Sequence, residues 1–87
     1  MKKGPIIFSK DLELALKGFT PIFGNEDDIS IAEDMGKLQK KLGEIDTVAF
    51  RQAEADRDDK KLTGKMKEIQ REENNLVYRI TKRNLDF

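Results

Sequence analysis

Apolar residues recur at helical spacing through most of the chain, and this pattern predicts long amphipathic helices. From Ile31 onward the intervals alternate between four and three residues, which is the heptad seam of a coiled coil. A second seam begins at Leu62, one position out of phase with the first. Together the two predicted seams comprise Ile31, Met35, Leu38, Leu42, Ile45, Leu62, Met66, Ile69, Leu76 and Ile80.

The polar stretch between the two seams allows two arrangements. The chain can continue as one long helix, or it can turn back near residues 55–59 and form an antiparallel hairpin with helices at about 28–55 and 59–83. In the hairpin every seam position has a partner, with Ile31 opposite Ile80 at one end. We favour the hairpin, although residues 55–62 contain neither Pro nor Gly.

One layer of the predicted hairpin is polar, because its register places Glu73 opposite Leu38. We expect this layer to lie at a solvent-open edge, with the Glu73 stem along the helix and its carboxylate in water. The alternative is a buried polar residue that fixes the register or the choice of partner.

An apolar arm, residues 1–24, precedes the hairpin of residues 25–87. Ser9 is a good N-cap for a short helix at about 10–17, and Pro21 prevents that helix from continuing. The "PIIF" segment before it reads as extended chain. The predicted fold is therefore all-α: an antiparallel, coiled-coil-like helical hairpin preceded by a short N-terminal helix with apolar extended arms.

The arm is needed because a two-helix hairpin of this size does not bury enough apolar surface to offset its chain entropy. It can cover its own hairpin, lie on a second copy of the chain, or dock onto a different protein. Its large apolar residues are the predicted partner-binding residues: Ile6, Ile7, Phe8, Leu12, Leu16, Phe19, Ile22 and Phe23.

Charge divides the chain into three blocks even though its formal net charge is zero. Residues 1–24 carry +2, residues 25–59 carry −6 and residues 60–87 carry +4. An acidic helix folded against a basic one is attractive, which favours the hairpin. The balanced total provides no global field that would attract nucleic acid or an anionic membrane.

Candidate chemistry is sparse. The chain has no Cys and no His, which removes disulfides, thiolate metal sites and the usual general base. It contains no phosphate-binding loop or zinc-protease motif, and its acidic stretches lack the spacing of a calcium loop. We therefore expect no enzymatic activity, cofactor, metal ion or small-molecule substrate.

Basic residues near the C-terminus are candidates for contact with nucleic acid. Glu68, Glu72 and Glu73 interrupt them, and only Tyr78 offers an aromatic platform for a base, so we do not expect this partner. The candidates are Lys60, Lys61, Lys65, Lys67, Arg71, Arg79, Lys82 and Arg83.

The predicted function is a non-enzymatic protein–protein interaction module, namely a small helical oligomeric adaptor or structural accessory subunit. The alternatives are a stoichiometric inhibitor or regulator of a host factor and, after that, a nucleic-acid-binding regulator. No apolar run reaches the length of a secretory or membrane-spanning segment, so we expect a cytoplasmic protein. A charged hairpin is too general a pattern to indicate a family. An origin in a phage or mobile element is an expectation only because small, cysteine-free proteins of this type are common there.

Overall fold

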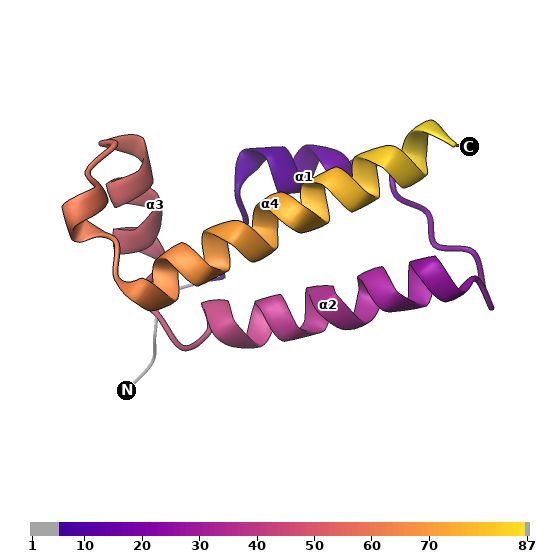
Figure 1. Ribbon diagram of the computed structural model, residues 1–87, viewed down its shortest axis with the longest axis horizontal. Coiled ribbons are helices and arrows are strands. Elements are labelled where there is room, and N and C mark those ends of the chain that lie inside the picture. Colours follow the sequence, from indigo (N-terminus) through magenta and orange to yellow (C-terminus); the bar gives the residue numbers. More distant parts are fainter. Residues whose placement is uncertain (1–5, 87) are drawn as a thin grey trace.

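The computed structural model describes residues 6–86, so the first five residues of the predicted arm and Phe87 lie outside the described part. Figure 1 shows an all-α fold in which a short helix precedes an antiparallel hairpin, as predicted. The elements in chain order are α1 (Lys10–Lys17), α2 (Glu26–Leu42), α3 (Thr47–Ala55), the 3-10 helix η1 (Asp59–Lys61) and α4 (Gly64–Leu85).

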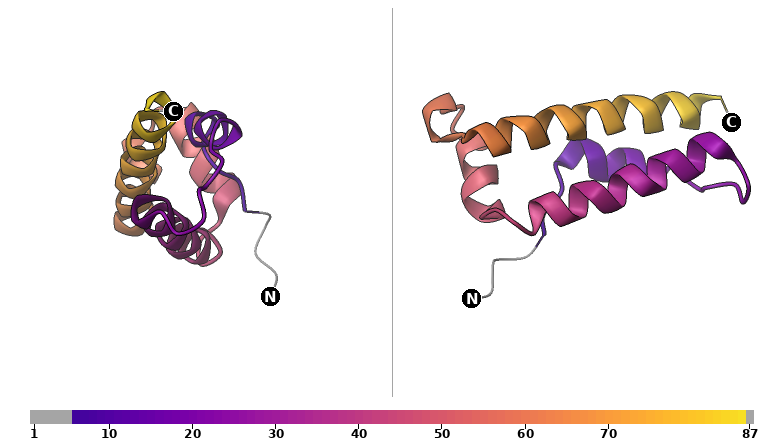
Figure 2. Two further views of the ribbon diagram at one scale, coloured as in Figure 1. Left: turned by 90° about the vertical axis from the view of Figure 1, so that its right-hand side faces the viewer. Right: turned by 60° about the horizontal axis from the view of Figure 1, so that its bottom comes forward.

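Helix α4 is the centre of the fold, because it packs against both α1 and α2. The end-on view in Figure 2 places these three helices at the corners of a triangle, and Figure 1 shows α3 across one end of them. Helix α1 runs parallel to α4 and α2 runs antiparallel to it. The buried apolar core comprises Leu12, Ala15, Ile31, Leu38, Leu42, Ile45, Phe50, Ala53, Leu62, Met66, Ile69, Leu76 and Ile80.

Ion pairs between α2 and α4 define the register of the hairpin. Asp28 Oδ1 lies 3.0 Å from Arg83 Nε. Asp28 precedes Ile31 by three residues and Arg83 follows Ile80 by three, so this pair fits the predicted layer of Ile31 and Ile80. Further along, Lys41 meets Glu72 at 2.6 Å. The acidic and basic blocks therefore pair within one chain.

The first helix of the hairpin differs from the prediction of one helix at about 28–55. It is broken into α2 and α3, because α2 ends at Leu42 and the Asp46 side chain caps a new helix by accepting the Ala49 N–H at 3.1 Å. This change of direction turns Phe50 into the core and leaves Ala49 exposed. A continuous helix from Ile31 to Ile80 is excluded.

The turn that closes the hairpin is formed without glycine. Arg57 adopts a left-handed conformation with φ of 54°. The Arg57 N–H donates to the Glu54 carbonyl and the Asp58 N–H donates to the Ala53 carbonyl, both at 3.1 Å, which is the Schellman pattern of a helix C-terminus. Residues 59–61 then form η1, so α4 begins at Gly64 and not near residue 59.

The arm covers its own chain. Ser9 caps α1 by accepting the Leu12 N–H at 3.2 Å, and Leu12 and Ala15 are buried. Asn84 of α4 donates to the Ala15 carbonyl at 3.0 Å. A Cβ on Gly18 would lie 3.1 Å from the Asn84 amide nitrogen, so this close approach of α1 to α4 favours glycine.

The expectation that Glu73 lies at a solvent-open edge is wrong. Its exposed fraction is only 2%, so the alternative of a buried polar residue describes it better. The reason is Arg51, which the break between α2 and α3 brings against Glu73 from outside the predicted seam. A buried carboxylate is tolerated when it is paired and fully hydrogen-bonded.

Candidate functional site

Arg51 and Glu73 form what we call the Glu73 clamp, which holds the start of the arm. Arg51 Nη1 and Nη2 donate to Glu73 Oε1 and Oε2 at 2.9 and 2.6 Å. Arg51 Nε and Nη2 also donate to the Ile7 carbonyl at 3.0 and 2.8 Å, and Glu73 Oε2 accepts the Ser9 N–H at 3.2 Å. The pair therefore binds one carbonyl and one N–H, two residues apart, on the arm.

The charge of Arg51 is maintained despite its burial. Burial disfavours the charged guanidinium, but hydrogen bonds to Glu73 and Glu54 outweigh this effect and raise the pKa of Arg51. The guanidinium carbon also lies 4.4 Å from the centre of the Phe50 ring, a cation–π contact. The Glu73 clamp thus holds a charged guanidinium inside the fold.

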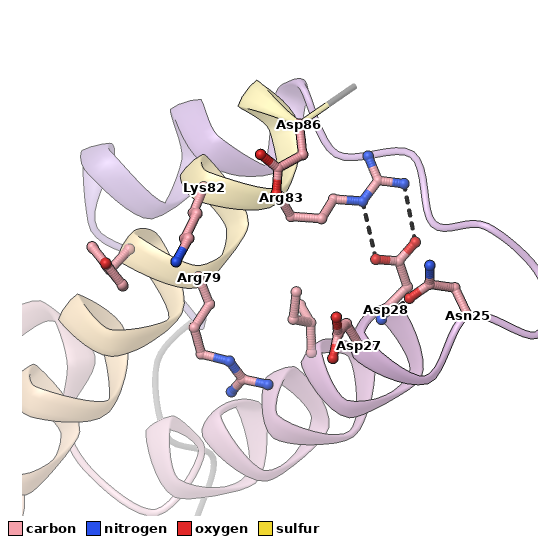
Figure 3. A pocket seen from close by; sticks show the side chains of 9 residues that line it. Asn25, Asp27, Asp28, Arg79, Lys82, Arg83 and Asp86 are labelled. Atoms are coloured by element: carbon pink, nitrogen blue, oxygen red, sulfur yellow. Dashed lines mark hydrogen bonds and ion pairs between the residues drawn. The ribbon is translucent and has the colours of Figure 1, made fainter.

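Asp28 and Arg83 form the Asp28 clamp, which holds the end of the arm. Arg83 Nε and Nη2 donate to Asp28 Oδ1 and Oδ2, each at 3.0 Å, and Figure 3 shows the two side chains facing each other. Arg83 Nη2 also donates to the Thr20 carbonyl at 2.7 Å, and Asp28 Oδ2 accepts the Ile22 N–H at 2.7 Å. The same pattern of one carbonyl and one N–H, two residues apart, recurs here.

The Asp28 clamp is also held in its charged form. The hydrogen bond from Arg83, followed by that from the Ile22 N–H, lowers the pKa of Asp28 and outweighs the opposing effect of burial. Asp28 in turn raises the pKa of Arg83. The guanidinium carbon of Arg83 lies 5.3 Å from the centre of the Phe19 ring, so each clamp has an arginine over a phenylalanine.

Beside the Asp28 clamp, the loop between α1 and α2 and the first turns of α2 form an exposed apolar surface. Phe23 is fully exposed, and Ile22 and Ile29 are exposed by 43% and 47%. These side chains line a hollow of about 360 Å³. We call this the Phe23 surface and define it by Pro21, Ile22, Phe23, Ile29 and Ala32.

A second hollow, of about 360 Å³, lies between the start of α2 and the end of α4 (Figure 3). Its lining carries three cations, which are matched by three carboxylates. Of the cations, Arg83 is paired with Asp28 and Arg79 with Asp34. This balance gives an anion or a cation little electrostatic reason to bind. The lining charges are Asp27, Asp28, Asp86, Arg79, Lys82 and Arg83.

The structure divides the predicted partner-binding residues into three groups. Leu12 is buried in the core, where it covers its own chain. Ile7, Phe8, Leu16 and Phe19 are half-buried. Ile6, Ile22 and Phe23 are exposed.

Ile29 and Ala32 are additional members of the exposed apolar surface that the sequence reasoning missed. Both lie outside the heptad seam, and that offset is the signal that could have identified them as outward-facing apolar residues.

The basic residues proposed for nucleic acid are partly occupied by acidic partners. Arg79, Arg83 and Lys65 pair with Asp34, Asp28 and Glu44 on the α2 side of the hairpin. Lys61 lies 4.0 Å from carboxylates in its own turn. The remaining members, Lys60, Lys67, Arg71 and Lys82, are exposed and have no ion pair to another described residue.

No helix within residues 6–86 combines the length and apolar character needed to cross a membrane. Over the same residues, no three acidic side chains are grouped so as to hold a metal ion. Comparison of the chain with models of protein families, with curated proteins and with solved structures found no match. Functional inference therefore depends on the two clamps and the Phe23 surface.

Proposed function

We propose that this protein is a non-enzymatic protein–protein interaction module that binds its partner through the Phe23 surface. The observation that carries the proposal is the exposure of Phe23, Ile22 and Ile29 side by side around one apolar hollow. Burying one such side chain is worth about 1.5–3 kcal/mol, so leaving a group of them in water is unfavourable for an isolated protein. Contiguous exposed apolar patches of this kind mark interaction sites.

The Asp28 clamp supports the proposal because it holds the loop that displays Phe23. Thr20 and Ile22, which precede Phe23, are bound through their backbone to Arg83 and Asp28. Asn25, which follows it, caps α2 by accepting the Asp28 N–H at 3.1 Å. A loop fixed on both sides of its apolar residue loses little conformational entropy when it binds, so the surface is preorganised for a partner.

The buried acidic groups also support a non-enzymatic role. Asp28 and Glu73 are the buried carboxylates among the described residues, and both are fully engaged by an arginine and by a backbone N–H. A carboxylate whose oxygens are already occupied by these hydrogen bonds is poorly placed to exchange a proton with a substrate. These groups are positioned to hold the chain.

Site-specific photo-crosslinking tests the proposal. Position 23 carries p-benzoylphenylalanine in one variant, and position 14 carries it in the control, because Leu14 is an exposed apolar residue on α1 with charged neighbours. Irradiation in cells of the native source should give a discrete adduct from position 23 that excess wild-type protein competes away, and none from position 14. Equal background at both positions would contradict the proposal.

A further inference from the structure

The charged side chains of α2 fall into two groups. Three of those that face α4 form ion pairs, namely Asp28 with Arg83, Asp34 with Arg79, and Lys41 with Glu68 and Glu72; Asp27 also faces α4 and lines the hollow there. A second row, at spacings of seven, four and three residues, is exposed and forms no ion pair with any described residue; its Lys37 lies nearest to α4, beside Glu72 and Arg79. This row has acids in the first half of the helix and lysines in the second: Glu26, Glu33, Lys37 and Lys40.

A stripe of apolar and small side chains runs beside this charged row. Ile29, Ala32 and Gly36 are at positions i, i+3 and i+7 of α2 and are exposed. A Cβ on Gly36 would meet no atom within 4 Å, so nothing in the monomer requires a glycine there. A glycine inside a helix lowers its stability by about 1 kcal/mol relative to alanine, yet it allows another helix to approach closely.

Large apolar side chains lie at both ends of the stripe. Phe23 and Ile22 lie at the start of α2. At the other end Ile6, which is 46% exposed, lies 4.0 Å from the position of a Cβ on Gly43. The exposed face of α2 is therefore apolar at its ends and small in its middle, with a charge gradient along its flank.

We propose that the occupant of the Phe23 surface is a second copy of this chain, docked with its α2 antiparallel to the first. In this arrangement Ala32 packs against Gly36 of the other copy, Phe23 reaches Ile6, and the flanking row pairs Glu33 with Lys37 and Glu26 with Lys40. The inference rests on the proposed function and names its partner.

Charge complementarity favours a second copy in this orientation. Turning α2 end over end brings its acidic half against a basic half, so one surface is complementary to itself about a twofold axis. A parallel pairing would place Glu26 and Glu33 against the same acids. A helix of 17 residues is about 25 Å long, which makes a small interface, so the dimer is reversible and depends on concentration.

A charge-swap mixing experiment tests the arrangement. One variant carries Glu26→Lys and Glu33→Lys, and the other carries Lys37→Glu and Lys40→Glu. Each variant alone has four like-charge contacts in its dimer and should dissociate at least about tenfold more readily than wild type in sedimentation equilibrium. An equimolar mixture restores all four opposite-charge contacts and should recover a dissociation constant within about threefold of wild type.

Two matched controls change the net charge by the same amount elsewhere. Asp11→Lys with Glu13→Lys alters the first turn of α1, and Lys60→Glu with Lys67→Glu alters exposed lysines outside α2. Both should dimerise like wild type, and circular dichroism should show the same helix content in all variants. Dimerisation of each swap variant alone, or failure of the mixture to recover, would overturn the antiparallel pairing.

A strictly monomeric wild-type protein would also overturn the inference. The photo-crosslinking result then separates the two proposals: a position-23 adduct with a different protein leaves the proposed function standing, whereas the absence of any specific adduct removes both.

Discussion

The two clamps make the same contacts at opposite ends of the arm, but different parts of the molecule lie next to them. In each, an arginine–carboxylate pair binds one carbonyl and one N–H of the arm, and a phenylalanine ring lies near the guanidinium. The Glu73 clamp includes Arg51 of α3, the helix that lies across one end of the fold (Figure 1). The Asp28 clamp lies at the open end, next to the Phe23 surface.

A buried ion pair therefore has two different roles in this molecule. At the closed end the pair joins α3, α4 and the arm around the core residues Phe50 and Ala53, so its role is to complete the fold. At the open end the pair holds a loop whose apolar side chain remains in water. Buried ion pairs add little net stability but are strongly destabilising when one partner is removed, so both clamps specify where the arm lies.

The largest expected effect comes from the closed end. Glu73→Ala leaves the Arg51 charge buried without its main partner and removes the acceptor of the Ser9 N–H. We expect a loss of about 3–5 kcal/mol in the free energy of unfolding, measured by urea denaturation. Glu68→Ala, which removes an exposed pair with Lys41, should remain close to wild type. Equal stability of the two variants would contradict the role of the Glu73 clamp.

At the open end we expect a smaller, local effect. Asp28→Asn removes one side of the bidentate pair with Arg83 but keeps an acceptor for the Ile22 N–H. The fold should persist while the loop at residues 20–24 loosens, so limited proteolysis should cut this loop much faster than in wild type. Cleavage spread over the whole chain at the same rate would mean that the Asp28 clamp acts on the fold as a whole.

Acid should weaken the Asp28 clamp in a defined direction. The folded state lowers the pKa of Asp28, so its stabilising contribution is complete above the pKa of an unfolded aspartate, about 3.9, and is lost as the pH falls through the folded value. Urea denaturation at pH 6 and pH 3 should therefore show a difference between wild type and Asp28→Asn that shrinks at pH 3. A difference that grows at pH 3 would contradict this sign.

The smallest expected effect is a gain in stability at the turn that follows α3. Arg57 has a positive φ of 54°, a conformation that glycine adopts without strain. Arg57→Gly should raise the free energy of unfolding by up to about 1 kcal/mol. Its thermal denaturation can be compared with Lys60→Gly, which replaces a nearby residue outside the left-handed region and should not gain stability.

The hairpin could be predicted because two helices packed along their length leave a regular apolar spacing and complementary charges in the sequence. The register follows from the seams, as the pairing of Asp28 with Arg83 shows. The break before Thr47 could not be predicted from the apolar spacing, because that spacing continues through Ala49 although the helix does not. The local sign was Gly43 followed by Asp46, a helix end and a cap.

The candidate site was harder to predict than the fold. Burial of Glu73 depends on Arg51, which is 22 residues away and reaches it only after that break. The arm was identified as apolar, but composition does not say which of its residues face inward. Leu12 is buried on α1, which packs against α4, whereas Phe23 is exposed in a loop whose backbone is bound by Arg83.

Amide hydrogen exchange of Ser9 and Ile22 reports whether the arm is held on its own chain, because these two N–H groups donate to the carboxylates of the two clamps. We predict strong protection of both amides in the wild-type protein, with Ile22 losing protection selectively in Arg83→Met and Ser9 losing it in Glu73→Ala. Exchange of both amides at the rate of an unstructured peptide in wild type would contradict it, since the arm would then not be held on its own chain.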